Sequence, residues 1–365
     1  MVKNGTTSAG WTRWRCKACG LSTVRQRPDI TRRSQAQSFL AWVLSFEPQQ
    51  GSGGTGRSFR ASINWCWNIE VPQPGATGEV HQVVMLDGTY FQDWCLLIAY
   101  TGTHVIAWQW CDEEKKAAWQ ALLQRLPAPD MVVIDGGTGL NAALAECWPH
   151  TPIQRCYFHI MHTTTRHLTR RPKLEAGQEL RALVGALMKV TCLDEAAAWM
   201  SAYSSWEARW DEFLKHRTYA DTDHERPTGT NARTQWWYTH RELRKCRSLL
   251  RGLIRRDELF TWLTIDNAPA PRTTSPLEGG PNKAVKDLLR AHRAMPDHHA
   301  RRAVERLLNS RAEHPHKTND LINTSPSTPP LTRPTRDEPV NPQHGTDFTY
   351  EDGNHLRKGW AGRPN

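Results

Sequence analysis

Three short apolar segments between Val83 and Cys111 constrain the fold more than any other feature of the chain. They read VVMLDGTYF, WCLLIAY and VIAWQWC, are rich in β-branched and aromatic residues, and are separated by turn signals such as TGTH. This pattern predicts an antiparallel meander of three strands. A helical pattern follows over residues 113–126, and the run MVVI before Asp135 is typical of a buried strand.

The next segments extend this order to an α/β fold. Residues 140–147 have the pattern of a short helix, and residues 152–159 (PIQRCYFH) have that of a further strand. Three strands, a helix, a strand, a helix and a strand predict a mixed sheet. Residues 173–262 instead look wholly helical, and we expect them to form an insertion between two parts of one domain.

The charge of the chain changes sign along its length. The net charge is +10 over 365 residues, with +7 in residues 1–75, −6 in residues 76–150 and +9 in the remainder. This pattern favours a nucleic-acid partner, with carboxylates at a catalytic site and cations along the phosphates of the nucleic acid. The alternative is that the uneven charge arises by chance. No apolar stretch approaches the roughly 20 residues that span a bilayer, no secretory signal is visible, and nine scattered cysteines indicate reduced thiols. We therefore expect a cytoplasmic, nucleoid-associated protein without a membrane segment.

Two aspartates follow apolar runs and precede glycine. Asp87 comes before Gly88, and Asp135 before Gly136 and Gly137. Carboxylates at strand ends of one sheet can converge on hard cations such as Mg²⁺. The alternative is that Asp-Gly simply forms a turn after each strand.

A third carboxylate, Glu278, lies in TTSPLEGG ahead of a helical pattern. On spacing alone, a capping box with Ser275 as N-cap and Pro276 at the first helical position explains it without any function. If Glu278 were instead a metal ligand in the first helical turn, Lys286 and Arg293 would lie on roughly the same face and contact the DNA backbone.

Taken together, LDGTYF, VIDGGTGL, QRCYFHI and TTSPLEGG followed by LLRAHR resemble the Mutator-type bacterial insertion-sequence transposases, over about residues 1–312. The resemblance implies a ribonuclease H-like domain with a helical insertion before the glutamate. It also implies an Asp-Asp-Glu triad that binds two Mg²⁺ or Mn²⁺ ions, here Asp87, Asp135 and Glu278. The family's Cys-x-x-His pair is matched by Cys156 and His159, which we expect to support the site. Two ligands alone do not make a zinc site. The chain departs from the family at two positions, with Ser275 in place of Asn and Ala294 in place of Gly.

The N-terminus carries Cys16 and Cys19 at zinc-knuckle spacing, but a structural zinc needs four ligands. Related transposases place another CxxCG ahead of such a segment. We therefore expect that the chain begins at an internal Met, and that Zn²⁺ binds only if an upstream knuckle is present. Residues 31–46 and 57–67 could form a helix-turn-helix. The cations around the knuckle are expected to contact DNA: Arg13, Arg15 and Lys17.

Residues 241–256 predict an amphipathic helix with a cationic face. A solvated face is the usual explanation, but in this family the insertion lies along DNA. The preceding Trp236, Trp237 and Tyr238 are expected to be core residues rather than base-stacking groups. The predicted DNA contacts of the helix are Arg244, Arg247, Arg251 and Arg255.

The predicted organisation is a partial zinc-ribbon-like segment (1–28), a helical DNA-binding region (29–75), the first part of the catalytic domain (79–165), the insertion (166–265), the second part with the Glu helix (266–314) and a disordered tail (315–365). The predicted function is DNA cleavage at insertion-sequence ends and strand transfer by two-metal-ion phosphoryl transfer. The expected partners are double-stranded DNA, as terminal inverted repeats and target, and at least one further copy of the chain. The alternatives are an inactive DNA-binding remnant that binds ends or represses, and a nuclease that cuts without joining.

Overall fold

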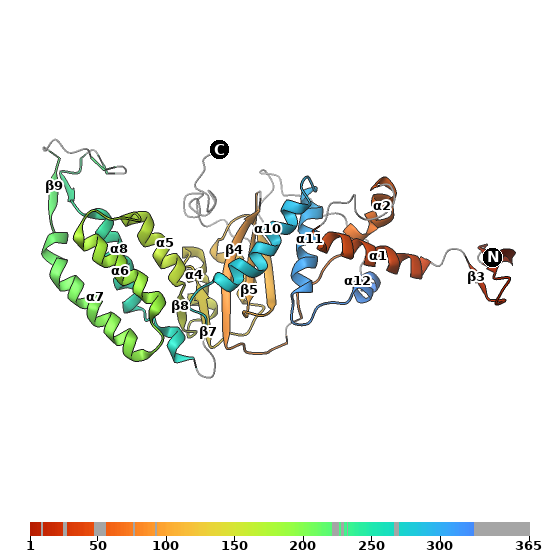
Figure 1. Cartoon of the computed structure of the whole chain (residues 1–365), viewed down its shortest axis with the longest axis horizontal. Coiled ribbons are helices and arrows are strands. Elements are labelled where there is room, and N and C mark those ends of the chain that lie inside the picture. The colour runs from red at the N-terminus through yellow and green to blue at the C-terminus, as the bar shows by residue number, and fades with distance from the viewer. Residues whose placement is uncertain are drawn as a thin grey trace. The chain divides into compact units, whose positions relative to one another are not determined.

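The computed structural model describes residues 1–324 except 9, 25–27, 47–55, 76, 92, 221–225, 228–229, 232 and 266–269. The described residues divide into two compact units (Figure 1). A larger unit holds residues 76–280, and a smaller unit combines residues 1–75 with those from 281 onward.

The larger unit is built on a five-stranded mixed sheet. Its strands are β4 (Val83–Phe91), β5 (Trp94–Tyr100), β6 (Val105–Cys111), β7 (Met131–Ile134) and β8 (Ile153–Arg155), in the order β6-β5-β4-β7-β8. The first three pair antiparallel, whereas β7 runs parallel to both β4 and β8. The predicted meander and mixed sheet are therefore confirmed.

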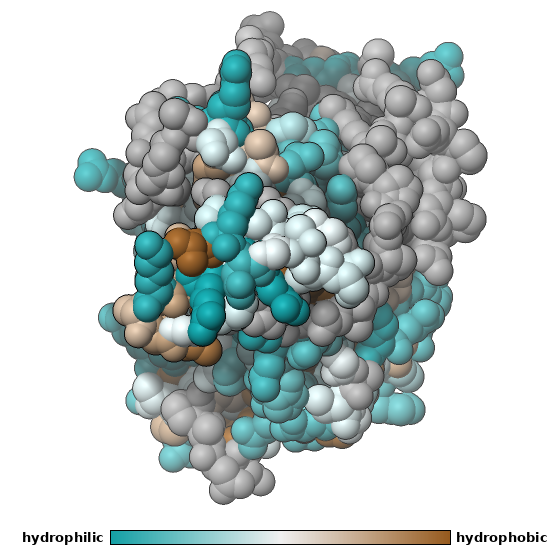
Figure 2. Space-filling view, turned by 90° about the vertical axis from the view of Figure 1, so that its right-hand side faces the viewer, coloured by the Kyte–Doolittle hydropathy of each residue, from teal (hydrophilic) through white to brown (hydrophobic). Residues whose placement is uncertain are grey.

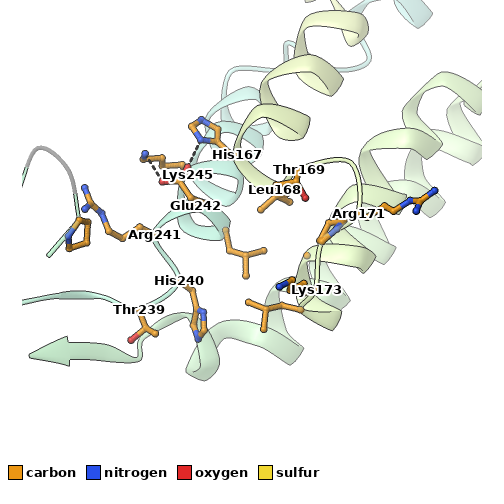
Figure 3. Close-up of a pocket in the computed structure, with 15 residues that line it drawn as sticks. His167, Leu168, Thr169, Arg171, Lys173, Thr239, His240, Arg241, Glu242 and Lys245 are labelled. Atoms are coloured by element: carbon orange, nitrogen blue, oxygen red, sulfur yellow. Dashed lines mark hydrogen bonds and ion pairs between the residues drawn. The ribbon is translucent and has the colours of Figure 1, made fainter. Parts of the chain in front are cut away.

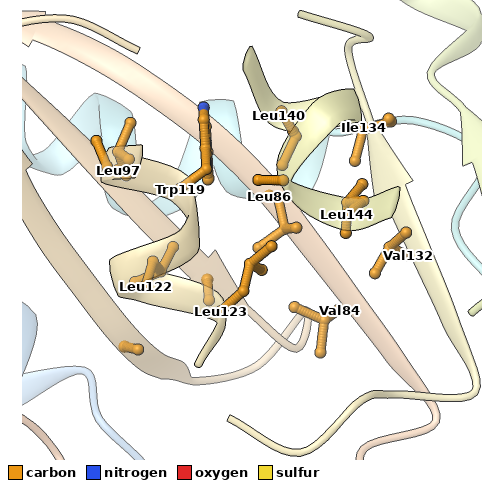
Figure 4. Packing of buried hydrophobic residues seen from close by; sticks show 14 of the residues in the cluster. Val84, Leu86, Leu97, Trp119, Leu122, Leu123, Val132, Ile134, Leu140 and Leu144 are labelled. Atoms are coloured by element: carbon orange, nitrogen blue, oxygen red, sulfur yellow. The ribbon is translucent and has the colours of Figure 1, made fainter. Parts of the chain in front are cut away.

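Two helices cover one face of this sheet, α3 (Lys116–Leu123) and α4 (Thr138–Cys147). Figure 4 shows the resulting core, in which strand residues such as Leu86 and Ile134 pack beneath Trp119 and Leu140. Successive side chains of a strand point to opposite faces. Because Leu86 faces α3 and α4, its neighbour Asp87 faces the other side of the sheet.

The strand expected over residues 152–159 is wrong beyond Arg155. Helix α5 (Tyr157–Leu168) begins there, with Cys156 as its N-cap residue. The N–H of Cys156 still donates to the carbonyl of Ile134 on β7 (2.8 Å), while its own carbonyl accepts from Ile160 (3.1 Å). Cys156 thus belongs to both the sheet and the helix. The alternating apolar residues of this segment conceal the change from the residue period of a strand to that of a helix.

The insertion is not wholly helical. It contains α6 (Glu175–Ala186), η3 (Leu187–Lys189), α7 (Leu193–Leu214), α8 (Arg241–Arg255) and η4 (Thr261–Thr264). Between α7 and α8 lies an antiparallel pair, β9 (Arg217–Tyr219) and β10 (Trp236–Tyr238). Aromatic residues favour a strand here, and only Trp237 of the three is buried. The guanidinium group of Arg217 instead lies 3.9 Å from the ring centre of Trp236, and that of Arg244 lies 3.4 Å from the ring centre of Tyr238.

The smaller unit begins with a three-stranded antiparallel sheet of β1 (Val2–Thr6), β2 (Thr12–Arg15) and β3 (Ser22–Val24). Its helical elements are α1 (Pro28–Leu44), α2 (Gly56–Ile63), η2 (Asn64–Asn68), α10 (Lys283–Ala291), α11 (Asp297–Ser310) and α12 (Thr318–Thr324). Helices therefore form in both N-terminal segments where the sequence pattern predicts them.

Aromatic packing joins the two chain segments of the smaller unit. Phe39 and Trp67 meet edge to face with ring centres 4.6 Å apart, and Trp42 meets His292 at 5.0 Å. His292 Nε2 also lies 3.0 Å from the carbonyl oxygen of Val43. The chain after residue 281, predicted as the second part of the catalytic domain, thus packs with residues 1–75.

The disorder predicted from residue 315 is wrong for residues 315–324. Helix α12 buries Leu321, and His316 bonds through its backbone N–H to Asn309 Oδ1 (2.9 Å). A single well-buried leucine and local hydrogen bonds hold a segment whose composition is otherwise polar. Residues 325–365 lie outside the described part of the chain. Among the described helices, none is both long and apolar enough to cross a membrane.

Candidate active site

Asp87 and Asp135 are brought together by the parallel ladder between β4 and β7. The ladder ends at the pair Leu86 and Ile134, so the two aspartates follow at equivalent positions on neighbouring strands. Asp87 does not end its strand, because β4 continues to Phe91 and Asp87 pairs with Ile98 of β5. The turn interpretation of the Asp-Gly pair is therefore wrong for Asp87.

Asp135 does end its strand, and a tight turn follows it. The N–H of Gly137 donates to Asp135 Oδ1 (2.9 Å), and Gly136 has a φ of +95°, which favours glycine. A Cβ at Gly136 would lie 1.4 Å from the guanidinium carbon of Arg155. The turn therefore orients the carboxylate of Asp135 and leaves room for the guanidinium group of Arg155.

Glu278 is not held by the predicted capping box. The N-cap of α9 (Ser275–Leu277) is Thr274, and no side chain caps the helix. Glu278 starts a π-helical turn (η5, Glu278–Asn282) that contains Pro281, whose missing N–H disrupts ordinary helical bonding. Instead, the Thr274 hydroxyl donates to Glu278 Oε1 (2.6 Å), which fixes the carboxylate.

Cys156 and His159 lie beside this glutamate. The N–H of Thr274 donates to Cys156 Sγ (3.3 Å), and His159 Nδ1 is 4.0 Å from Glu278 Oε1. One ligand atom from each of Cys156, His159 and Glu278 lies within 4.8 Å of the others. The expected pair is thus part of a group of three that could hold a metal ion, and Thr274 ties it to the glutamate.

The carboxylates influence one another electrostatically. Burial, together with the negative charges of Asp135 and Glu278, raises the pKa of Asp87 well above its usual range. Burial by itself lowers the pKa of His159, but its hydrogen bond to Cys156 and the charges of Cys156 and both aspartates raise it to about 9. His159 is consequently a cation at neutral pH, surrounded by acidic groups.

The sequence pattern missed a further acid, Glu114. Burial and the negative charges of Asp135 and Asp87 raise the pKa of Glu114 well above the usual range. Glu114 is therefore close enough to both aspartates to interact with them electrostatically. Nothing in the sequence distinguishes Glu114 from its acidic neighbours Asp112 and Glu113. Its position depends on the packing of α3 against the sheet.

The donor set fits a hard divalent cation. Asp87, Asp135 and Glu278 supply carboxylate oxygens, the ligands that Mg²⁺ and Mn²⁺ prefer. All three residues are half-buried. The raised pKa of Asp87 reflects first its burial and then the negative charges of Asp135 and Glu278, which a bound cation would neutralise.

The cationic face predicted on α8 is largely occupied by the protein itself. Arg247 is buried and pairs with Asp211 (2.9 Å) on α7, so the prediction that it contacts DNA is wrong. Arg244 is half-buried and donates to the carbonyl of Leu214 (2.9 Å). Arg251 is exposed and pairs with Glu207 (2.5 Å), whereas Arg255 is exposed without an ion pair among the described residues.

The other predicted DNA contacts lie at the surface of the smaller unit. Arg293 follows the end of α10 at Ala291, so it does not share a helical face with Lys286 as expected. The exposed cations are Arg13, Arg15, Lys17, Lys286 and Arg293. On the face shown in Figure 2, hydrophilic side chains lie beside apolar ones.

Cys16 and Cys19 remain a pair of free thiols near this end, with Cys16 half-buried and Cys19 exposed. Hydrogen bonds from the backbone of Cys19 and Ala18 and from the Cys19 side chain lower the pKa of Cys16. Within the described residues, no His, Asp, Glu or further Cys joins them at metal-binding distance.

A pocket of about 740 Å³ opens in the insertion between α5, α6 and α8 (Figure 3). Its basic lining residues include Arg171, Lys173, Arg241 and Lys245. Lys245 pairs with Glu242 (2.8 Å), but Arg171 and Lys173 are exposed and have no acidic partner among the described residues. The insertion therefore presents cations at a different place from the one that the sequence indicates.

Comparison with known proteins agrees with the sequence motifs. Residues 97–245 match the model of the family described as "Transposase, Mutator family". This span contains Asp135, Cys156 and His159, begins after Asp87 and ends before Glu278.

A curated relative points to the same family. The chain is 32% identical over 112 residues to a protein named "Transposase for insertion sequence element ISRM5" from Rhizobium meliloti (strain 1021). The match covers 29% of this chain and 27% of that protein, so the chain spans about a quarter of the length of the curated relative it matches. The central region of the chain is therefore similar to Mutator-family insertion-sequence transposases.

Proposed function

We propose that this chain cleaves DNA at the ends of an insertion sequence and joins them to target DNA, using a ribonuclease H-like domain in residues 76–280. The observation that carries the proposal is the equivalent placement of Asp87 and Asp135 beyond the last pair of the β4–β7 ladder. Glu278 lies within electrostatic reach of Asp87 and completes a three-carboxylate set. The family match supports the same reaction class.

In this proposal Asp87 and Asp135 hold two divalent cations, Mg²⁺ or Mn²⁺, and Glu278 holds one of them. When bound, such ions lower the pKa of an attacking water or 3′ hydroxyl and stabilise the leaving oxygen. The protein groups supply the geometry: the sheet aligns the two aspartates, and the Thr274 hydroxyl orients Glu278. The positive charge of His159 limits the repulsion among the acids when substrate is absent.

The proposed partner is double-stranded DNA, both as terminal inverted repeats and as target. Exposed cations without ion pairs among the described residues, such as Arg171, Lys173 and Arg255, would bind phosphates in the insertion. Arg13, Arg15 and Lys17 would do so in the smaller unit. Joining two ends in one reaction requires at least a dimer, so we also propose that the active form is a homodimer or larger. Zinc binding by Cys16 and Cys19 would require two more ligands.

A strand-transfer assay with end DNA, target DNA and Mg²⁺ tests the proposal. Asp87→Asn and Asp135→Asn should abolish both cleavage and joining, while end binding stays within about twofold, because each removes a carboxylate without changing the side-chain shape. Asp130→Asn is the matched control, since Asp130 is exposed at the opposite end of β7 and should leave activity unchanged.

Each failure has its own meaning in this assay. End binding without any Mg²⁺-dependent cleavage by the wild-type chain would identify an inactive remnant. Cleavage without joining would identify a nuclease. Loss of end binding together with activity in both Asp variants would show that the aspartates are structural.

A further inference from the structure

The π-helical turn at Glu278 brings its carboxylate to the start of helix α5. Cys156 is the N-cap residue of α5 and His159 follows three residues later, so both side chains lie on the same side of the first helical turn. His159 Nδ1 is 4.0 Å from Glu278 Oε1, and one ligand atom from each of the three residues lies within 4.8 Å of the others. The tertiary structure thus adds a third potential ligand to the Cys-x-x-His pair.

This group of three favours different metal ions from the three carboxylates. It offers a sulfur, an imidazole nitrogen and a carboxylate oxygen, a mixture that Zn²⁺ binds well, whereas Mg²⁺ prefers oxygen ligands alone. Atoms that share a tetrahedral zinc lie roughly 3.4–3.6 Å apart, so the ligand atoms need to approach one another by about 1 Å. The side chains of His159 and Glu278 are 23% and 25% exposed, and their rotation can provide this shift.

The surroundings of Cys156 and His159 favour a bound cation. Burial by itself raises the pKa of Cys156, but hydrogen bonds from His159 and Thr274 lower it below its usual value, which favours the thiolate that binds metals. His159 Nδ1 is buried, and no oxygen or nitrogen atom of the described residues forms a hydrogen bond with it. The favourable neighbour of the ring is the Cys156 sulfur, a weak acceptor. A metal ion at Nδ1 would compensate this buried polar atom.

We propose that Cys156, His159 and Glu278 form a binding site for Zn²⁺, with water as the remaining ligand. Binding displaces the proton from His159 Nδ1, and any remaining proton from Cys156 Sγ, to the solvent. Glu278 belongs to both donor sets, so Zn²⁺ bound here weakens the binding of a hard cation at Asp87 and Asp135. This second consequence rests on the proposed function, whereas the zinc site itself does not.

Titration with Co²⁺, a coloured substitute for Zn²⁺, tests the site without DNA. The full chain carries Cys16→Ser and Cys19→Ser, because two free thiols at knuckle spacing also attract such ions. A charge-transfer band from thiolate to cobalt should appear in the near ultraviolet. One equivalent of Zn²⁺ should remove the band, and excess Mg²⁺ should leave it in place. If no such band appears, the proposal is wrong.

Substitutions identify the ligands in the same background. Cys156→Ser should abolish the band and weaken Zn²⁺ binding in calorimetry at least about tenfold, since the loss of even a supporting group costs that much. His159→Gln and Glu278→Gln should weaken it by a similar factor, and they decide the matter if Cys156→Ser does not fold. Cys147→Ser is the matched control, a half-buried cysteine outside the group, and should change neither the band nor the affinity. A band that survives Cys156→Ser would refute the assignment.

Calorimetry with Mn²⁺ separates this inference from the proposed function. Zn²⁺ binds such a mixed donor set more tightly than Mn²⁺ does and therefore stays in place. With one equivalent of Zn²⁺ bound, Mn²⁺ affinity should fall by about the factor that Glu278→Gln causes alone, because both remove the same carboxylate. Mn²⁺ binding that Zn²⁺ leaves unchanged would refute the competition. If the cobalt band depends on Cys156 but the wild-type chain binds no Mn²⁺, the zinc site stands and the proposed carboxylate site fails.

Discussion

Asp87 and Asp135 occupy equivalent positions on adjacent parallel strands, each one residue beyond the final pair of the ladder, Leu86 and Ile134. This arrangement places two acidic side chains next to each other on the two neighbouring inner strands β4 and β7. Unless a cation is bound, the repulsion between them opposes folding. In the proposed metal site, stability is thus exchanged for cation binding, and the cost in stability can be measured.

We expect Asp87→Asn to stabilise the metal-free protein, increasingly so as the pH rises above about 4. The folded-state pKa of Asp87 is raised, so its contribution to stability is complete below the usual pKa of 3.8 and is lost as the pH rises toward the folded value. Within that window, wild-type stability should fall relative to Asp87→Asn by up to about 1.4 kcal/mol per pH unit. Thermal melting in EDTA between pH 4 and pH 8 measures the difference, and equal pH profiles for the two proteins would contradict it.

Thr274→Val should reduce strand transfer about tenfold without weakening end binding. The buried hydroxyl of Thr274 holds Glu278, and a hydrogen bond to a charged group contributes about 1.5–3 kcal/mol. Thr274→Ser keeps the hydroxyl and should keep most of the activity. If Val and Ser at this position behave alike in the joining assay, the hydroxyl does not position the glutamate.

Arg247 and Arg255, both on α8, should respond differently to substitution by alanine. Arg247→Ala breaks the pair with Asp211 and should lower the free energy of unfolding by about 1–3 kcal/mol without changing DNA affinity. Arg255→Ala should leave the melting temperature unchanged and reduce the salt dependence of DNA binding by about one phosphate contact. Binding measured from about 50 to 200 mM salt distinguishes the two roles. A reduced salt slope in Arg247→Ala would restore the original prediction.

Ala294→Gly should stabilise the smaller unit. Ala294 has a φ of +65°, a left-handed conformation that costs a non-glycine residue roughly 1–2 kcal/mol. After subtracting the entropy that glycine loses on folding, a gain of about 0.5–1 kcal/mol is expected. Ala291→Gly at the end of α10 is the opposite control and should destabilise by about 0.5–1 kcal/mol. Denaturant unfolding measures both, and a loss of stability in Ala294→Gly would show that the strain is absent.

Local patterns along the chain were enough to predict the sheet, because strand periodicity and strand order are properties of adjacent residues. The meander from Val83, the buried strand before Asp135 and the two N-terminal helices all follow from such patterns. The transposase motifs were recognisable for the same reason, and the family match covers those around Asp135 and Cys156. The catalytic assignments of Asp87, Asp135 and Glu278 remain predictions.

Such local patterns do not predict contacts between segments that are far apart in the sequence. Spacing alone favoured a helix cap for Glu278, whereas packing of Thr274 against Cys156, 118 residues away, decided its orientation. Arg247 belongs to a cationic pattern, but Asp211 on another helix removes it from the surface.

By itself, the sequence determined the order of strands in the central sheet and the similarity of the central region to Mutator-family transposases, since both depend on neighbouring residues. The tertiary structure alone decided which charges meet. Gly88 and Gly139 look like ordinary turn residues in the sequence, yet in the fold they provide the space that Glu114 fills. Electrostatic interactions act through space, so their partners appear only once the chain has folded.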